Sequence, residues 1–406
     1  MSEAKRKSQK TRGLQRQVRL FLTCVHACDD EGGTTESLQS YLIKEKPIME
    51  SNAHIVEYWK TQPEVLEACL KNSLPLTENF VKLYQEVRPT HLYLVGSGTS
   101  LNAEETAVSF MKEMLDIDVI SMPSSYVHDI RGDRPMFVFL SQGGSSTNTL
   151  KAMEETAAYP FITVTGEETC EIASRSSCHM VIGCGEEPVG PKTVGYTASV
   201  MILYLMAMEA GRVVGAIGEE KYAYVRTVLE TGIAHMRYNM EAIAGWTADH
   251  KEKLQSIEKY IFIGHGTGAA ALKEGSLKVL ETIKYPAFSY EFEEYLHGPI
   301  LAVDACTGAF LFLSGKPEER ERFRQLAECQ SKYSQYTFLI TDEEGETDGN
   351  TLRIRKTGAM YTEVFEIVVI PQYLAAVVQG YLGIADGSPL YDEYTALCPT
   401  KFRNGK

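Results

Sequence analysis

The 406-residue chain lacks a long uninterrupted apolar run, a paired cysteine motif and an excess of positive charge. Its longest apolar stretch, residues 194–208, contains tyrosine, threonine and serine and falls short of the ~20 residues that span a bilayer. We therefore expect a buried core helix there and no membrane partner. The first residues are basic and polar and lack the apolar core of a secretion signal, so we expect no targeting segment.

The nine cysteines are scattered along the chain, without the repeated CxxC spacing that a zinc ribbon needs. Cys178, His179 and Cys184 lie in an apolar, strand-like run, and we interpret them as structural residues rather than metal ligands. The same interpretation applies to the cysteines and the histidine of residues 24–28. The sequence therefore predicts no metal site and a reducing, cytoplasmic location.

The formal net charge of -14 leaves no broad basic surface from which nucleic acid could release counterions. We therefore expect no nucleic-acid partner, and an anionic substrate would need a local pocket. With 44% hydrophobic and 23% charged residues, the chain has ordinary globular composition and is long enough for two compact domains.

A strand, a glycine-rich turn and a helix follow one another twice along the chain. Residues 91–96 form the first predicted strand, with the turn Gly96-Ser-Gly-Thr-Ser100, and the second such unit has the turn Gly264-His-Gly-Thr-Gly268. Further strands are expected at residues 118–122, 136–140, 161–165, 179–183, 309–313, 336–340 and 365–370. Strands that alternate with helices indicate parallel sheets covered on both faces. The sequence predicts an α/β fold of two doubly wound parallel-sheet domains in tandem.

The predicted domain boundaries follow from this repeat. Residues 1–48 are expected to be a disordered or poorly packed extension, 49–245 the first domain with its lead-in helices, and 246–406 the second domain with a C-terminal tail. The first domain is expected to end in one long helical section over residues 194–245. The tail from residue 386 onward is rich in loop-forming residues.

The run Ser141-Gln-Gly-Gly-Ser-Ser-Thr-Asn-Thr149 lies between a predicted strand and a predicted helix. Glycines and hydroxyl residues there allow backbone N–H groups and side-chain oxygens to converge on an anion at the helix start. A simple helix cap needs only one such residue. The run therefore predicts a phosphate monoester site. No Walker lysine follows it, and the glycine turns lack the full dinucleotide pattern, so we expect no nucleotide and no cofactor.

Three further residues are typical of acid–base chemistry. Lys278 and Glu281 are one helical turn apart on the same face, and His297 lies in a loop marked by Gly298 and Pro299. The residue pattern alone leaves two interpretations of this group open. It is either a catalytic centre, or a surface ion pair with an unrelated loop histidine.

These motifs together resemble the tandem sugar isomerase (SIS) family. The helix from Glu274 to Glu281, the sequence His297-Gly-Pro-Ile300, the phosphate run and Gly98-Thr99-Ser100 are similar to the isomerase half of glutamine-fructose-6-phosphate aminotransferase and to its deglycase relatives. The resemblance implies a C1/C2 proton shuttle at Glu281, ring opening by His297, assistance from Lys278 and an imine at Lys401. It also implies that the sugar phosphate is bound by Ser100, Ser141, Gln142, Gly143 and Ser146.

The resemblance implies an enzyme that acts on a 6-phosphorylated amino sugar, either a fructosamine 6-phosphate deglycase or a glucosamine-6-phosphate deaminase/isomerase. Glutaminase activity is not expected, because residues 1–50 are too few for a glutaminase domain. The family also suggests a homodimer in which His297 reaches the partner's active site. The alternative is a non-catalytic phosphosugar-binding regulatory module.

Overall fold

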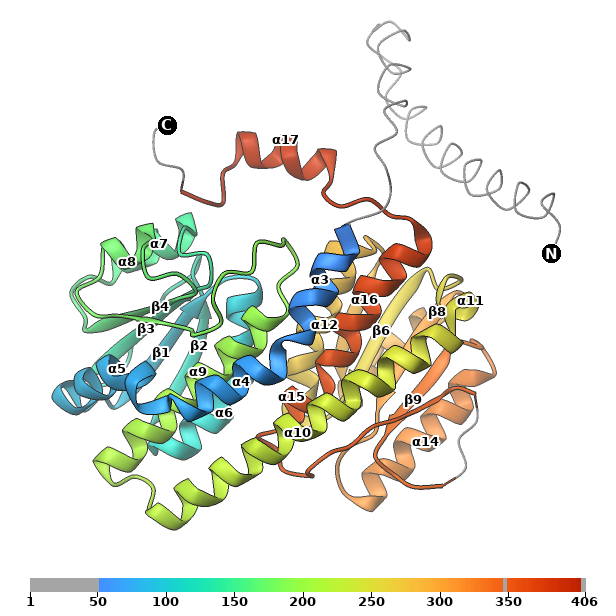
Figure 1. Ribbon diagram of the computed structural model, residues 1–406, viewed down its shortest axis with the longest axis horizontal. Helices are drawn as coiled ribbons and strands as arrows, with labels where there is room; N and C mark the ends of the chain where they lie inside the picture. Colours follow the sequence, from blue (N-terminus) through green and yellow to red (C-terminus); the bar gives the residue numbers. More distant parts are fainter. Residues whose placement is uncertain (1–50, 346–348, 403–406) are drawn as a thin grey trace, which may run out of the picture. The chain divides into compact units, whose positions relative to one another are not determined.

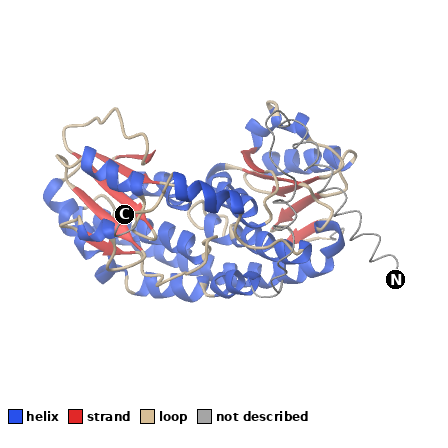
Figure 2. Cartoon of the chain, turned by 90° about the horizontal axis from the view of Figure 1, so that it is seen from above, coloured by secondary structure: helices blue, strands red, loops and turns tan. Residues whose placement is uncertain are grey.

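The computed structural model describes residues 51–345 and 349–402, so the predicted extension at residues 1–48 lies outside the described residues. The described chain contains two five-stranded parallel sheets with helices packed against them (Figures 1 and 2). The predicted fold class, two doubly wound α/β units in tandem, is confirmed.

The two sheets have the same strand order. The first sheet runs β2-β1-β3-β4-β5 and the second, read from the corresponding edge, β7-β6-β8-β9-β10. The strands of the first sheet are β1 (His91–Gly96), β2 (Asp118–Pro123), β3 (Pro135–Ser141), β4 (Phe161–Thr165) and β5 (His179–Val181). Those of the second are β6 (Lys259–Gly264), β7 (Ala287–Glu291), β8 (Thr307–Phe312), β9 (Thr337–Thr341) and β10 (Thr351–Arg353). In each sheet the chain reverses its direction across the sheet after its second strand, which opens a crevice between the carboxyl ends of the first and third strands.

Helices connect the strands and cover the sheets. Those up to the middle of the chain are α3 (Ser51–Lys60), α4 (Gln62–Lys71), α5 (Ser73–Val87), α6 (Thr99–Leu115), α7 (Thr147–Glu155), α8 (Glu171–Ser174), α9 (Val194–Val214) and α10 (Glu219–Asp249). They are followed by α11 (Lys251–Leu254), α12 (Gly266–Thr282), α13 (Phe292–Leu296), the 3-10 turn η1 (Pro299–Ala302), α14 (Pro317–Ser331), α15 (Glu363–Ile367), α16 (Val369–Leu382) and α17 (Pro389–Leu397). The lead-in helices expected in the first domain correspond to α3 and α4, and Pro63 lies in the first turn of α4, where proline is tolerated.

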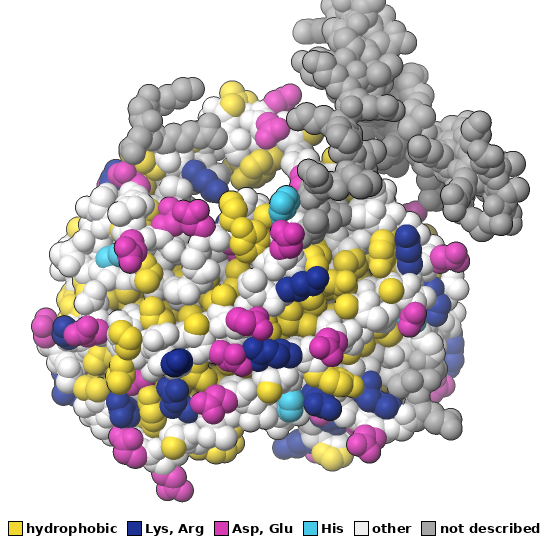
Figure 3. Space-filling model, in the orientation of Figure 1, with side chains coloured by type: hydrophobic (Ala, Val, Ile, Leu, Met, Phe, Trp, Pro, Cys, Tyr) yellow, Lys and Arg dark blue, Asp and Glu magenta, His cyan; other side chains and the backbone are white. Residues whose placement is uncertain are grey.

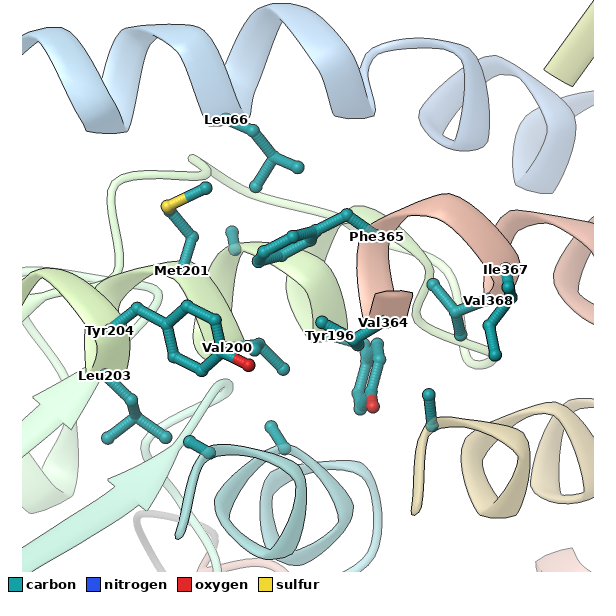
Figure 4. Packing of buried hydrophobic residues seen from close by; sticks show 14 of the residues in the cluster. Leu66, Tyr196, Val200, Met201, Leu203, Tyr204, Val364, Phe365, Ile367 and Val368 are labelled. Carbon is teal, nitrogen blue, oxygen red and sulfur yellow. The ribbon is translucent and has the colours of Figure 1, made fainter. Parts of the chain in front are cut away.

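The largest hydrophobic cluster runs continuously from one sheet to the other, with α9 near its middle. Figure 4 shows side chains of α9 beside those of α15 and Leu66 of α4, and the rings of Tyr204 and Phe365 meet edge to face at 5.8 Å. Two helical runs, Val194–Val214 and Glu363–Leu382, are long and apolar enough to cross a membrane, but 83% and 78% of their apolar windows are buried inside the protein. They are packed as core helices. On the visible face of the molecule, acidic and basic side chains are interspersed (Figure 3).

The strand predicted at residues 365–370 is wrong, because these residues are helical and belong to α15 and α16. The run from Val364 to Ile370 is rich in β-branched residues, which favour strands, but it is buried on all sides. A fully buried helix and a buried strand have the same continuous apolar pattern, so periodicity does not separate them.

Three smaller predictions also need correction. The helical section at residues 194–245 is two helices, because Gly215 ends α9 in a left-handed conformation (φ 80°) and α10 begins after Gly218. The tail expected to be loop contains the helix α17. Strands β7 and β10 were not predicted, because both are short edge strands in which most residues are only partly buried.

Candidate functional site

An open cavity of about 960 Å3 lies at the carboxyl ends of β1 and β3, where the strand order reverses. Its walls come from the turn after β1, the loop after β3, the loop before α9, the end of α12 and the C-terminal tail. All five residues predicted to bind phosphate line it, together with two predicted to be catalytic: Ser100, Ser141, Gln142, Gly143, Ser146, Glu281 and Lys401. Fold geometry therefore joins residues that lie up to three hundred positions apart in the sequence.

The predicted phosphate loop leads from β3 into α7 and has free hydrogen-bond donors. Within the described residues, the backbone N–H groups of Gly143, Ser145 and Ser146 donate to no protein acceptor. The hydroxyl of Ser146, the N-cap residue, does not cap the helix either. Unpaired N–H groups at a helix start attract an anion, because the helix dipole adds to their partial positive charge.

Lys278 is held between two carboxylates in the helix α12. Its Nζ lies 3.0 Å from Glu274 Oε1 and 2.6 Å from Glu281 Oε2. Glu274 is fully buried and also accepts hydrogen bonds from Thr99 Oγ1 at 3.0 Å and Asn102 Nδ2 at 2.7 Å, both from α6. The network therefore links the two domains and fixes the carboxylate of Glu281 at the cavity wall.

Charge pairing decides the protonation states in this network. Burial alone would lower the pKa of Lys278, but the two carboxylates more than compensate and raise it to about 12. The pKa of Glu274 is raised, because burial outweighs the stabilisation from Lys278 and Asn102. Lys278 is thus a permanent cation, and it cannot serve as the base at neutral pH.

The comparisons with known proteins agree with this geometry. The chain matches no protein-family model. It is 23% identical over 301 residues to a glutamine-fructose-6-phosphate aminotransferase (isomerizing) from Oceanobacillus iheyensis, across 71% of this chain and 46% of that protein. The chain spans about half the length of such curated relatives.

Solved structures show the same architecture. A provisionally named phosphosugar isomerase from Clostridium difficile 630 has a TM-score of 0.79 at 25% identity, covering 86% of this chain and 99% of that one. The chain is a tandem SIS-fold protein. The glucosamine-6-phosphate deaminase of Thermotoga maritima has the fold more distantly, with a TM-score of 0.55 at 20% identity over 76% of this chain and 93% of that one. The predicted family resemblance is confirmed.

Two of the predicted catalytic residues do not line the cavity. Lys278 is buried and contacts the wall residue Glu281, whereas His297 lies apart from the site. It follows α13, is exposed, and is not among the residues that line the cavity of its own chain. Nearby Leu301 is 89% exposed. The predicted role of His297 therefore needs either a movement of its loop or a second copy of the chain.

The C-terminal tail closes one side of the SIS cavity. After α17 it reaches the phosphate loop, where Thr147 N donates to Thr400 O at 3.1 Å and Phe402 N donates to Ser145 O at 2.6 Å. This short pairing places Lys401 opposite Ser146. The tail thus brings Lys401 to the cavity, although no side chain of α17 is buried.

Sequence reasoning missed the wall formed by residues 185–193. The carboxylate of Glu187 is 3% exposed and accepts hydrogen bonds from Thr193 N at 2.7 Å and Gly195 N at 2.9 Å, so it caps α9. A Cβ at Gly195 would lie 1.6 Å from Gln142 Nε2, so glycine at this position leaves room for the Gln142 side chain at the helix start. The signal in the sequence was a charged, proline-containing loop immediately before the longest apolar stretch of the chain.

Among residues 51–345 and 349–402, no cluster of three or more His, Cys, Asp or Glu side chains could hold a metal ion. Cys178 and Cys184, which are predicted to be structural, are partly buried, and burial raises the pKa of both thiols. The cytoplasmic location and the absence of metal, cofactor, nucleic-acid and membrane partners remain predictions.

Proposed function

We propose that the chain catalyses a C1/C2 proton transfer on a 6-phosphorylated amino sugar, with release of the amine. The observation that carries this proposal is the position of the Glu281 carboxylate, which lines the same cavity as the free N–H groups of the phosphate loop. A phosphate held by the loop directs the other end of an open-chain sugar toward a fixed base. The similarity to sugar-phosphate isomerases and to a deaminase supports the same chemistry.

The proposed reaction needs one base that both takes and returns a proton. On a fructosamine 6-phosphate, the Glu281 carboxylate removes a proton from C1 and the enaminol is reprotonated at C2, which leaves an imine at C1. On glucosamine 6-phosphate the proton moves from C2 to C1, and the imine forms at C2. Water then hydrolyses the imine and the amine leaves. Lys278 holds the carboxylate of Glu281 in position through an ion pair of 2.6 Å.

Deuterium exchange tests the proposal. We expect the protein in deuterated water to exchange hydrogen at C1 or C2 of glucosamine 6-phosphate or a fructosamine 6-phosphate, with amine release, as followed by proton NMR. The unphosphorylated sugars should exchange far more slowly, because they leave the N–H groups of the phosphate loop unoccupied. Tight binding without exchange would instead favour a phosphosugar-binding regulatory module.

We further propose that the protein is a homodimer in which His297 opens the sugar ring in the partner's cavity. The exposure of His297 and Leu301 supports this arrangement. Mixing an inactive Glu281→Gln chain with an inactive His297→Ala chain should restore about a quarter to a half of the activity, since mixed dimers contain one intact composite site. The absence of restoration in verified mixed dimers would assign His297 to its own chain.

A further inference from the structure

Lys192 is a cavity lysine that the sequence motifs did not single out. It lies in the loop between β5 and α9, lines the cavity and is only partly exposed. Its ammonium group donates to the backbone oxygen of Glu187, five residues earlier in the same loop. This bond holds the amine at the cavity wall.

The neighbouring carboxylate does not form an ion pair with this lysine. The oxygens of Glu187 are occupied by the start of α9, through Thr193 N, Thr193 Oγ1 and Gly195 N. In the described part of the chain, no carboxylate oxygen lies within 4.0 Å of Lys192 Nζ. By contrast, Lys278 in the same site has two such partners. Among the described residues, Lys192 is therefore a partly buried amine with no carboxylate at ion-pair distance.

Burial and charged groups of the site both act on the pKa of this amine. Burial lowers the pKa of Lys192, and the charges of Lys401 and Lys278 lower it further, against the opposing effect of Glu187. A desolvated lysine beside other cations is more often present as the neutral amine, which is the nucleophilic form.

We propose that Lys192 is the cavity lysine that forms an imine with the sugar's carbonyl carbon, in place of Lys401. This inference rests on the proposed function and specifies its covalent step. The neutral Nζ attacks the carbonyl carbon, and the protons of the amine pass to the oxygen, which leaves as water. On a sugar that already carries an imine after proton transfer, Nζ attacks the imine carbon. The double bond then forms between this carbon and Nζ, and the substrate's nitrogen takes both protons of Nζ and leaves as the amine.

Lys401 is less suited to this step. It lies in the exposed tail, which is held by two backbone hydrogen bonds to the phosphate loop and by Arg175 against the ring of Phe402 at 5.4 Å. The position of the Lys401 amine depends on the few contacts that hold the tail against the phosphate loop. Lys192 is instead anchored directly before the buried helix α9. The family resemblance suggested Lys401, but burial and anchoring favour Lys192.

Borohydride trapping distinguishes the two lysines. The whole protein is incubated with fructose 6-phosphate or glucose 6-phosphate and sodium cyanoborohydride, and its peptides are mapped by mass spectrometry. We expect the sugar phosphate adduct on Lys192 in the unaltered protein and in Lys401→Arg. Lys192→Arg, which keeps the charge but cannot form the imine, should lose at least nine-tenths of the labelling, because guanidinium is not deprotonated in proteins.

An adduct on Lys401 in the unaltered protein, or no adduct at all, would overturn the inference, and neither result depends on the folding of a variant. Deuterium exchange at C1 or C2 is measured on the same samples. Exchange without any adduct would contradict only the imine at Lys192 and would still support the proposed function. If neither the adduct nor deuterium exchange were observed, the proposed function would be contradicted as well.

Discussion

Glu281→Gln is expected to lower C1/C2 deuterium exchange by at least ~10²-fold with little change in sugar phosphate affinity. The amide has nearly the same shape as the carboxylate but cannot accept the proton. Lys278 keeps its second carboxylate, Glu274, so its position should persist. NMR exchange rates and calorimetric dissociation constants, measured on the same preparation, separate chemistry from binding.

Glu328→Gln is the matched control, since Glu328 lies on the exposed surface of α14 and, among the described residues, forms an ion pair only with Lys332 at 3.6 Å. It should exchange hydrogen at the unaltered rate. If Glu281→Gln also kept that rate, the base would have to be sought elsewhere in the cavity, and the reading of residues 274–281 as the catalytic helix would be wrong.

Most of the fold could be predicted from short-range patterns in the sequence. The two glycine turns and the strands beside them were recognised because buried parallel strands read as short apolar runs bounded by turn residues. The phosphate loop was recognised because it holds more glycines and hydroxyl residues than a helix cap needs. Helical spacing also placed Lys278 beside Glu281, which the structure bears out at 2.6 Å.

What could not be predicted depends on contacts between distant segments. Nothing local marks Glu274 as the fully buried partner of Lys278, because its burial comes from packing against α6 of the other domain. Nothing local places Lys192 at the cavity either, because its loop meets the phosphate loop only in the folded chain, where Gln142 Nε2 donates to Glu187 Oε2 at 3.4 Å. His297 shows the opposite case, since a residue assigned to the site by family spacing is exposed away from its own chain's cavity.

Lys278→Met is expected to destabilise the protein by ~3–5 kcal/mol at neutral pH, because it leaves a buried carboxylate without its cation. Lys278 is 1% exposed and Glu274 is fully buried. Without the lysine, the folded-state pKa of Glu274 is raised further above its unfolded value. The folded variant therefore binds a proton that the unfolded chain releases. Its stability should fall as the pH rises from the unfolded to the folded pKa, and the loss should shrink in acid.

Urea denaturation of three variants checks this account. Lys273→Met, which removes a cation from the same helix but only from an exposed pair with Glu105 at 2.6 Å, should cost less than about 1 kcal/mol. Adding Glu274→Gln to Lys278→Met removes the stranded charge and should recover much of the lost stability. If Lys278→Met lowered the free energy of unfolding no more than Lys273→Met, or if this loss did not change with pH, the buried cation would not be what holds α12 against α6. The fixed position of Glu281, on which the proposed proton transfer depends, would then need another explanation.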